Sequence, residues 1–171
     1  MTDIRHHIPE PMLAAYAAGT LPRAFELVIA AHISLCDECR AGLEAHEILG
    51  GALLDDTPCA DLSEGLADRV MGLLDAPCAV REAPRRKGIY PGPVAEAMRN
   101  GAPRWKKLGM GVRQDILFHD KDGSARLLYI PPGAAVPDHG HRGTELTLVL
   151  QGAFNDETGY FGVGDLEVAD E

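Results

Sequence analysis

The sequence predicts an α + β protein of two domains, a small helical domain stapled by zinc and an all-β sandwich or small barrel. Apolar residues recur at helical spacing in the first part of the 171-residue chain, which also holds a cluster of potential metal ligands. After Trp105 the apolar pattern changes to the alternation typical of strands. Proline, glycine and basic residues separate the two patterns, so we expect domains at 1–77 and 94–171 and a linker at 78–93.

The first domain should begin with two short helices. The segment 9–18 is rich in alanine and leucine, and it stops at Gly19, a residue suited to a left-handed helix end. Thr20 can then cap a second helix, which starts near Leu21 and Pro22 and runs to about residue 33.

Two further helices complete the expected four-helix domain. The third begins near Cys36 and continues to residue 49, where Gly50 and Gly51 weaken it. Ser63 can cap the fourth helix. Its apolar residues follow the single stripe of an amphipathic helix: Leu66, Val70, Leu73 and Leu74.

Metal-ligand spacing is found between residues 32 and 39, which read H-I-S-L-C-D-E-C. Cys36 and Cys39 have the spacing of half a structural zinc site, and His32 lies one helical turn before Cys36. Three ligands can therefore converge on one zinc ion. The fourth ligand of the tetrahedron can be His6 or His7, at an N-terminus that a metal bond would tie down.

The same cysteine spacing also occurs in thioredoxin-like redox pairs, at the start of a helix that follows a strand. No strand pattern precedes the cysteines here, and the extra histidine has no role in dithiol chemistry. The sequence therefore favours zinc over a redox pair or unliganded thiols. Helical spacing in front of the motif is shown by Leu21, Phe25, Val28 and Ile29.

The formal charge of −10 is unevenly distributed. Residues 1–78 hold thirteen acids, four arginines and no lysine, a net charge of −9. Such a domain would repel nucleic acid and attract a basic protein surface. Acidic faces also keep small helical domains soluble, so charge alone does not select a partner.

Features of membrane spans and export signals are missing from the sequence. There is no run of eighteen apolar residues, and the N-terminus lacks the apolar core of a signal peptide. We therefore expect a cytoplasmic protein without a membrane partner. In that compartment Cys59 and Cys78 are expected to be free thiols rather than disulfide-bonded.

The second domain should consist of short strands. Alternating runs occupy residues 112–118, 125–130 and 145–150. Turn-forming residues separate or follow them at 120–123, 131–133 and 156–159. This arrangement is typical of an all-β sandwich or small barrel.

A second group of potential metal ligands lies in this β region. His139 and His141 are two residues apart, so in an extended chain they point to the same face, and Glu145 has the same parity. Two imidazoles and a carboxylate inside a barrel form a metal site with at least one open coordination position.

The spacing of this group resembles the first conserved motif of the cupin superfamily, from Gly133 through His139, His141 and Glu145 to Gly152. The resemblance implies a cupin-type double-stranded β-barrel whose metal is held by these ligands and a further histidine from a second motif. Residues 159–165 are similar to the start of that second region, but no histidine follows before residue 171. We therefore expect the barrel to be truncated at its C-terminal end.

The helical half resembles the zinc-binding domain of bacterial anti-sigma factors, and its combination with a cupin is similar to the ChrR family of anti-sigma factors. The motifs are R-H-H near the start, A-Y-A-A-G-T-L, H-I-S-L-C-D-E-C-R-A and T-L-V-L-Q-G-A-F. Carried over to this chain, the family's zinc ligands match four residues: His7, His32, Cys36 and Cys39. The cupin ligands match His139, His141 and Glu145, holding a second divalent metal that we expect to be zinc.

The resemblance also implies a function. Members of the family sequester an extracytoplasmic-function sigma factor in a one-to-one cytoplasmic complex and release it when singlet oxygen or related oxidants appear. A regulator of this kind is not an enzyme and does not contact nucleic acid directly. The alternative is a dioxygenase-like cupin enzyme, since the open coordination position could bind Fe(II) and activate oxygen.

Overall fold

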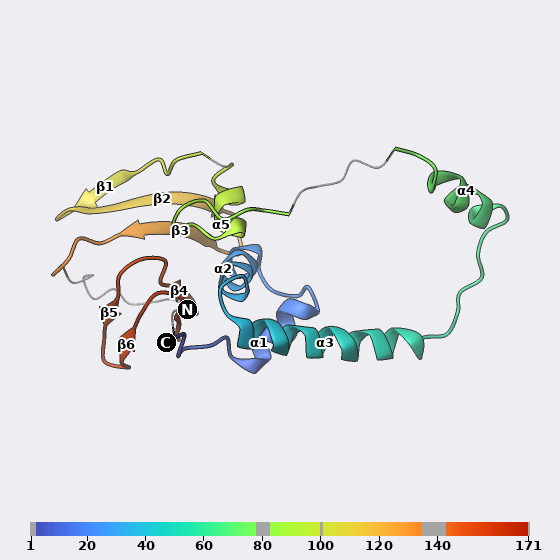
Figure 1. The fold of residues 1–171 in the computed structure, drawn as a ribbon, viewed down its shortest axis with the longest axis horizontal. Coiled ribbons are helices and arrows are strands. Elements are labelled where there is room, and N and C mark those ends of the chain that lie inside the picture. The colour runs from blue at the N-terminus through green and yellow to red at the C-terminus, as the bar shows by residue number, and fades with distance from the viewer. Residues whose placement is uncertain (1–2, 78–82, 100, 135–142, 171) are drawn as a thin grey trace.

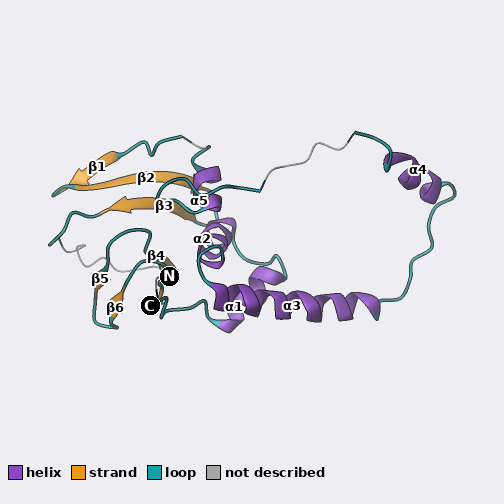
Figure 2. Ribbon diagram, in the orientation of Figure 1, coloured by secondary structure: helices purple, strands orange, loops and turns teal. Residues whose placement is uncertain are grey.

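The computed structural model describes residues 3–77, 83–99, 101–134 and 143–170, and the structural statements below concern these ranges. Four helices occupy the first half of the chain, and the second half holds one short helix followed by the strands (Figures 1 and 2), broadly as the sequence predicts. The helices are α1 (Glu10–Ala17), α2 (Arg23–Ile33), α3 (Asp37–Asp55), α4 (Leu66–Leu73) and α5 (Gly92–Ala97). The strands are β1 (Lys106–Gly109), β2 (Val112–His119), β3 (Ser124–Tyr129), β4 (Glu145–Leu148), β5 (Phe154–Asn155), β6 (Tyr160–Phe161) and β7 (Leu166–Ala169).

The link between α1 and α2 confirms one predicted signal and corrects another. Gly19 follows the end of α1 with φ of +65°, the left-handed conformation that glycine adopts readily. Thr20 does not cap α2, because its N–H and its hydroxyl both donate to the Ala15 carbonyl in the termination of α1. Pro22 occupies the N-cap position of α2 instead.

Two predicted boundaries of the later helices are wrong. Helix α3 continues through Gly50 and Gly51 to Asp55, since two glycines cost only about 1 kcal/mol each relative to alanine and neither adopts a positive φ. Helix α4 has Gly65 at its N-cap rather than Ser63. Ser63 contributes only its backbone carbonyl, which accepts the Leu66 N–H at 3.1 Å.

The strands form three small antiparallel sheets, with orders β1-β2-β3, β4-β7 and β5-β6. The three strands expected from alternation correspond to β2, β3 and β4. Each expected turn is closed by a backbone hydrogen bond: Asp120 to Gly123, Ala134 to Pro131, and Asp156 to Gly159. The second half is therefore the β-rich part that the sequence predicts.

Helix α2 lies at the centre of the molecule (Figure 1), where it packs against α1, α3, α5, β3 and β4. Two apolar clusters meet it on different sides. One contains the fully buried Ile29, with Ile8, Leu13 and Leu166. The other contains Ala31 of α2, Val94 of α5 and Leu127 of β3.

Strands β4 and β7 complete the first cluster. In their antiparallel register Leu146 lies opposite Val168, and Leu148 lies opposite Leu166, so these four side chains share one face of the pair. All four pack on the cluster around Ile29. The helical and β-rich halves therefore share a core.

The end of the expected linker is ordered. Pro91 is fully buried, and helix α5 begins at Gly92 and packs against α2. Residues 78–82, in the first part of that linker, lie outside the described ranges. None of the described helices is long and apolar enough to cross a membrane.

Helix α4 takes no part in either cluster. It lies apart from the other helices (Figure 1), and none of its residues is buried. Three residues of its predicted apolar stripe, Val70, Leu73 and Leu74, are exposed, as are all the residues of 47–65 that precede the helix, and Leu66 is half-buried. The core of the helical half is therefore built from α1, α2 and α3.

This packing predicts different roles for two isoleucines. Ile29 is 0% exposed, so Ile29→Ala should lower the free energy of unfolding by about 2–5 kcal/mol. Ile48 is 75% exposed, so Ile48→Ala should change it by less than about 0.5 kcal/mol. Urea denaturation of the two variants measures both values, and equal losses would contradict the described core.

Candidate metal centre

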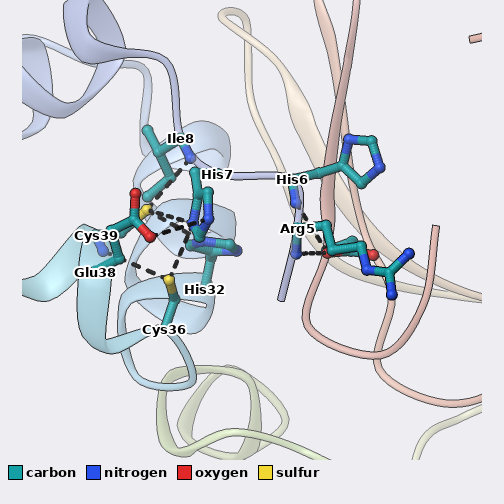
Figure 3. A network of polar contacts seen from close by, with 9 residues as sticks. Arg5, His6, His7, Ile8, His32, Cys36, Glu38 and Cys39 are labelled. Carbon is teal, nitrogen blue, oxygen red and sulfur yellow. Dashed lines mark hydrogen bonds and ion pairs between the residues drawn. The ribbon is translucent and has the colours of Figure 1, made fainter. Parts of the chain in front are cut away.

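An N-terminal arm, residues 3–8, carries the first residue of the site. The arm has no regular secondary structure and crosses the gap between the helices and the strands. The side chain of His7 points toward the helices, whereas that of His6 points toward the strands (Figure 3). The two candidates for the fourth ligand therefore face opposite halves of the molecule.

The junction of α2 and α3 carries the other three residues. His32 lies in the last turn of α2 and is 0% exposed, and its carbonyl accepts the N–H groups of Leu35 and Cys36. This turn brings Cys36 to the N-cap of α3, where its Sγ accepts the Cys39 N–H at 3.5 Å. The motif thus lies at the junction of two helices.

The side chains of His7, His32, Cys36 and Cys39 converge, with their ligand atoms all within 4.8 Å of one another. Nδ1 of His7 lies 3.3 Å from Sγ of Cys36 and 3.7 Å from Sγ of Cys39. Nε2 of His32 lies 3.3 Å from Sγ of Cys39. A zinc tetrahedron with bonds of about 2.3 Å to sulfur and about 2.0 Å to nitrogen has N···S edges of about 3.5 Å, so the cluster could hold such a metal.

A carboxylate orients one of these residues. Nε2 of His7 lies 3.3 Å from a carboxylate oxygen of Glu38, which leaves Nδ1 directed at the cysteines. Metal-binding histidines commonly pair their second nitrogen with a carboxylate in this way, because the pairing fixes the ring. Glu38 stands between the two cysteines in the sequence, and its role was not predicted.

Burial controls the protonation of the clustered side chains. It lowers the pKa of His32 to about 4, against a smaller upward effect of the Gly164 carbonyl, so the imidazole is neutral at pH 7, as a metal ligand must be. Burial also raises the pKa of the Cys39 thiol to about 11. A reactive redox cysteine needs a lowered pKa and exposure, so the pair suits a structural metal better than dithiol chemistry.

The second predicted group is described only in part. His139 and His141 lie outside the described residues. Glu145 begins β4, and its parity places it on the face opposite Leu146 and Leu148, away from the helical core. Among the described residues, the cluster around His32 is the one with metal-site geometry.

Cys59 and Cys78 were expected to be free. Cys59 is a free, exposed thiol between α3 and α4. Cys78 lies outside the described residues.

The fold and the cluster define a class of protein, in which a helical half with a His/Cys cluster that could hold a metal is joined to a β-rich half. Residues 95–171 match the family model described as the ChrR cupin-like domain. The chain is 54% identical over 172 residues to the anti-sigma-E factor ChrR of Cereibacter sphaeroides, an alignment covering 98% of this chain and 80% of that protein.

A solved structure agrees with these matches. The chain resembles one from the crystal structure of Rhodobacter sphaeroides SigE in complex with the anti-sigma ChrR, with a TM-score of 0.86 and 53% identity. The match covers 98% of this chain and 87% of that chain. This chain belongs to the ChrR family of anti-sigma factors.

The orientation of the arm predicts unequal effects of its two histidines. His7→Ala should weaken metal binding far more than His6→Ala, because only His7 faces the cysteines. Competition with a chromophoric chelator measures the zinc affinity of each variant. Equal losses, or a greater loss in His6→Ala, would show that the ligand set is misassigned.

Proposed function

We propose that this chain binds an extracytoplasmic-function sigma factor in a one-to-one complex in the cytoplasm and keeps it from core RNA polymerase. The observation that carries the proposal is a set of exposed apolar side chains on two separate elements, the second half of α3 and α4, which are together called the docking face. The SigE complex in which the related chain was solved supports the choice of partner. Zinc, bound by His7, His32, Cys36 and Cys39, is the proposed metal of the helical half.

The docking face is formed by large apolar side chains on the second half of α3 and on α4. Its members are Ile48, Leu49, Leu53, Leu54, Val70, Met71, Leu73 and Leu74, all at least half exposed. Burying one such side chain against a partner contributes about 1.5–3 kcal/mol. Exposed apolar surface of this extent is typical of a protein interface.

Acidic side chains surround the docking face. Glu44, Glu47 and Asp55 lie on α3, and Asp68 lies on α4, and each of them is exposed. A protein that binds DNA presents basic surfaces to the phosphates, and an acidic apolar surface complements them. The charge therefore favours a sigma factor over an acidic partner and argues against direct nucleic-acid binding.

Two exposed leucines provide a matched test of this surface. Leu49 on α3 is 58% exposed and Leu108 on β1 is 54% exposed. Leu49→Glu should weaken sigma-factor binding at least about tenfold, because it places a charge within the docking face. Leu108→Glu should leave the affinity unchanged. Calorimetric titration of both zinc-loaded variants decides this, and equal affinities would contradict the proposed surface.

We further propose that residues 94–171 sense a signal and that residues 1–77 bind the sigma factor, with 78–93 joining them. The proposed signal is singlet oxygen or related oxidants, as the family resemblance implies. The proposed sensor is a second metal, expected to be zinc, held by His139, His141 and Glu145. The shared core of the two halves supports communication between them.

The second hypothesis for the cupin-like half is a dioxygenase-like enzyme. Metal analysis distinguishes this hypothesis from that of a regulator. Zinc in both halves of protein purified under anaerobic conditions favours a regulator. Iron in the cupin-like half favours an oxygen-activating enzyme. Family membership supports a non-enzymatic function.

The sensor proposal predicts a separation of inhibition from release. Glu145→Gln should leave inhibition of the sigma factor intact, because Glu145 lies on the face of β4 turned away from the helices. It should abolish the response to singlet oxygen, because it removes a proposed ligand of the open metal site. Sigma-dependent transcription with and without singlet oxygen measures both, and a normal response in this variant contradicts the proposed sensor.

A further inference from the structure

The turn between β6 and β7, residues 162–165, contacts the N-terminal arm from the side opposite the metal centre. Oδ1 of Asp165 accepts the N–H of Arg5 at 2.6 Å and the N–H of His6 at 3.0 Å (Figure 3). Its Oδ2 accepts the N–H of Gly162 at 2.8 Å. One buried carboxylate therefore joins the arm to the turn by two charge-assisted hydrogen bonds, and it stabilises the turn itself by a third.

His6 adds three contacts on the same side. Its carbonyl accepts the Leu166 N–H at 3.1 Å, and its Nε2 lies 3.1 Å from the Tyr160 carbonyl oxygen. Its ring packs on Phe161 with 4.2 Å between centroids. Both the backbone and the side chain of the residue before His7 are thus held by the strands.

The arm and the turn are also in close contact at Gly164. Gly164 has φ of +95°, and a Cβ atom there would lie 2.7 Å from the side chain of Ile4. Only glycine suits this backbone conformation and this approach without strain.

We propose that Asp165 is a positioning residue for the metal centre, which holds the arm so that His7 stays at its place beside Cys36 and Cys39. The inference rests on the zinc site proposed above. His32, Cys36 and Cys39 come from one helix junction, whereas His7 comes from a segment with no secondary structure of its own. The cupin-like half therefore contributes to a metal centre whose ligands all lie in the helical half.

The arm needs a positioning residue because ordering it costs conformational entropy. Fixing one residue costs about 1–2 kcal/mol of backbone entropy, and the arm has no helix or strand to offset that cost. Burial raises the pKa of Asp165, but hydrogen bonds from the N–H groups of His6, Arg5 and Gly162 outweigh it, so the pKa is below its usual value. The ionised carboxylate supplies the order that the arm lacks.

A change in the β6–β7 turn would loosen His7 without touching any metal ligand directly. The arm is thus a physical connection by which the cupin-like half can bias the metal centre.

Zinc release from the 171-residue chain tests this inference. Asp165→Asn keeps the shape of the side chain but removes its charge and one of its two acceptor oxygens. It should speed the transfer of zinc from the helical site to a chelator by about tenfold or more, since outer-shell partners of metal ligands commonly have effects of this size.

Asp120 offers a matched control. Its Oδ1 also accepts two backbone N–H groups, from Asp122 at 2.8 Å and Gly123 at 3.0 Å, in the β2–β3 turn. Asp120→Asn should release zinc at the unmodified rate. Equal acceleration in both variants would mean a general loss of stability and would overturn the inference.

A double-mutant cycle identifies the route of the effect. If Asp165 acts through His7, Asp165→Asn should add nothing to the release rate of His7→Ala protein. Additive effects overturn the inference. If the unmodified chain holds no zinc in its helical half, the proposed metal site fails instead, so the two failures are distinguishable.

A second measurement needs no variant. In the zinc-loaded chain the amides of Arg5 and His6 should exchange with solvent as slowly as those of the β4–β7 pair, since both donate to a buried carboxylate. Fast exchange at both amides overturns the inference even if Asp165→Asn fails to fold.

Discussion

The convergence of two histidines and two cysteines on one point is the constraint on which the rest of the molecule depends. It joins an arm without secondary structure, the last turn of α2 and the first turn of α3. Burial keeps His32 neutral, as a metal ligand must be, and raises the pKa of the Cys39 thiol, so Cys39 would lose its proton on binding a metal rather than as a free thiolate. Because the apolar core of α1, α2 and α3 is small, a metal bound at this junction would contribute to folding itself.

Helix α2 connects the His/Cys cluster to the second half of the molecule through its packing contacts. One side of the helix packs into the cluster that β4 and β7 complete, and Ala31 packs into the cluster shared with α5 and β3. The docking face, in contrast, lies on the second half of α3 and on α4, outside both cores. Helices α2 and α3 therefore connect the His/Cys cluster, the cupin-like half and the α3 part of the proposed docking face.

Local patterns determined what the sequence could predict. The spacing of His32, Cys36 and Cys39 needs only one helix junction, and the turns at 120–123 and 156–159 are closed by neighbouring residues. The choice of His7 over His6 required a family resemblance. In an arm without regular secondary structure, sequence position does not predict the direction in which a side chain points. The contact of Asp165 with the arm could not be predicted from the sequence, because Arg5 and Asp165 are 160 residues apart and no local pattern connects them. The stripe of α4 was recognised, but periodicity does not say whether an apolar face meets the core or a partner.

Hydrogen exchange of the 171-residue chain before and after zinc is removed by a chelator tests the central claim most directly. The account predicts that the arm, the end of α2 and the start of α3 lose protection together, because one metal ion holds all three. The β2–β3 pair, which shares no residue with the cluster, should keep its protection. Unchanged protection at the α2–α3 junction after complete zinc removal would contradict the claim that the metal holds this fold together.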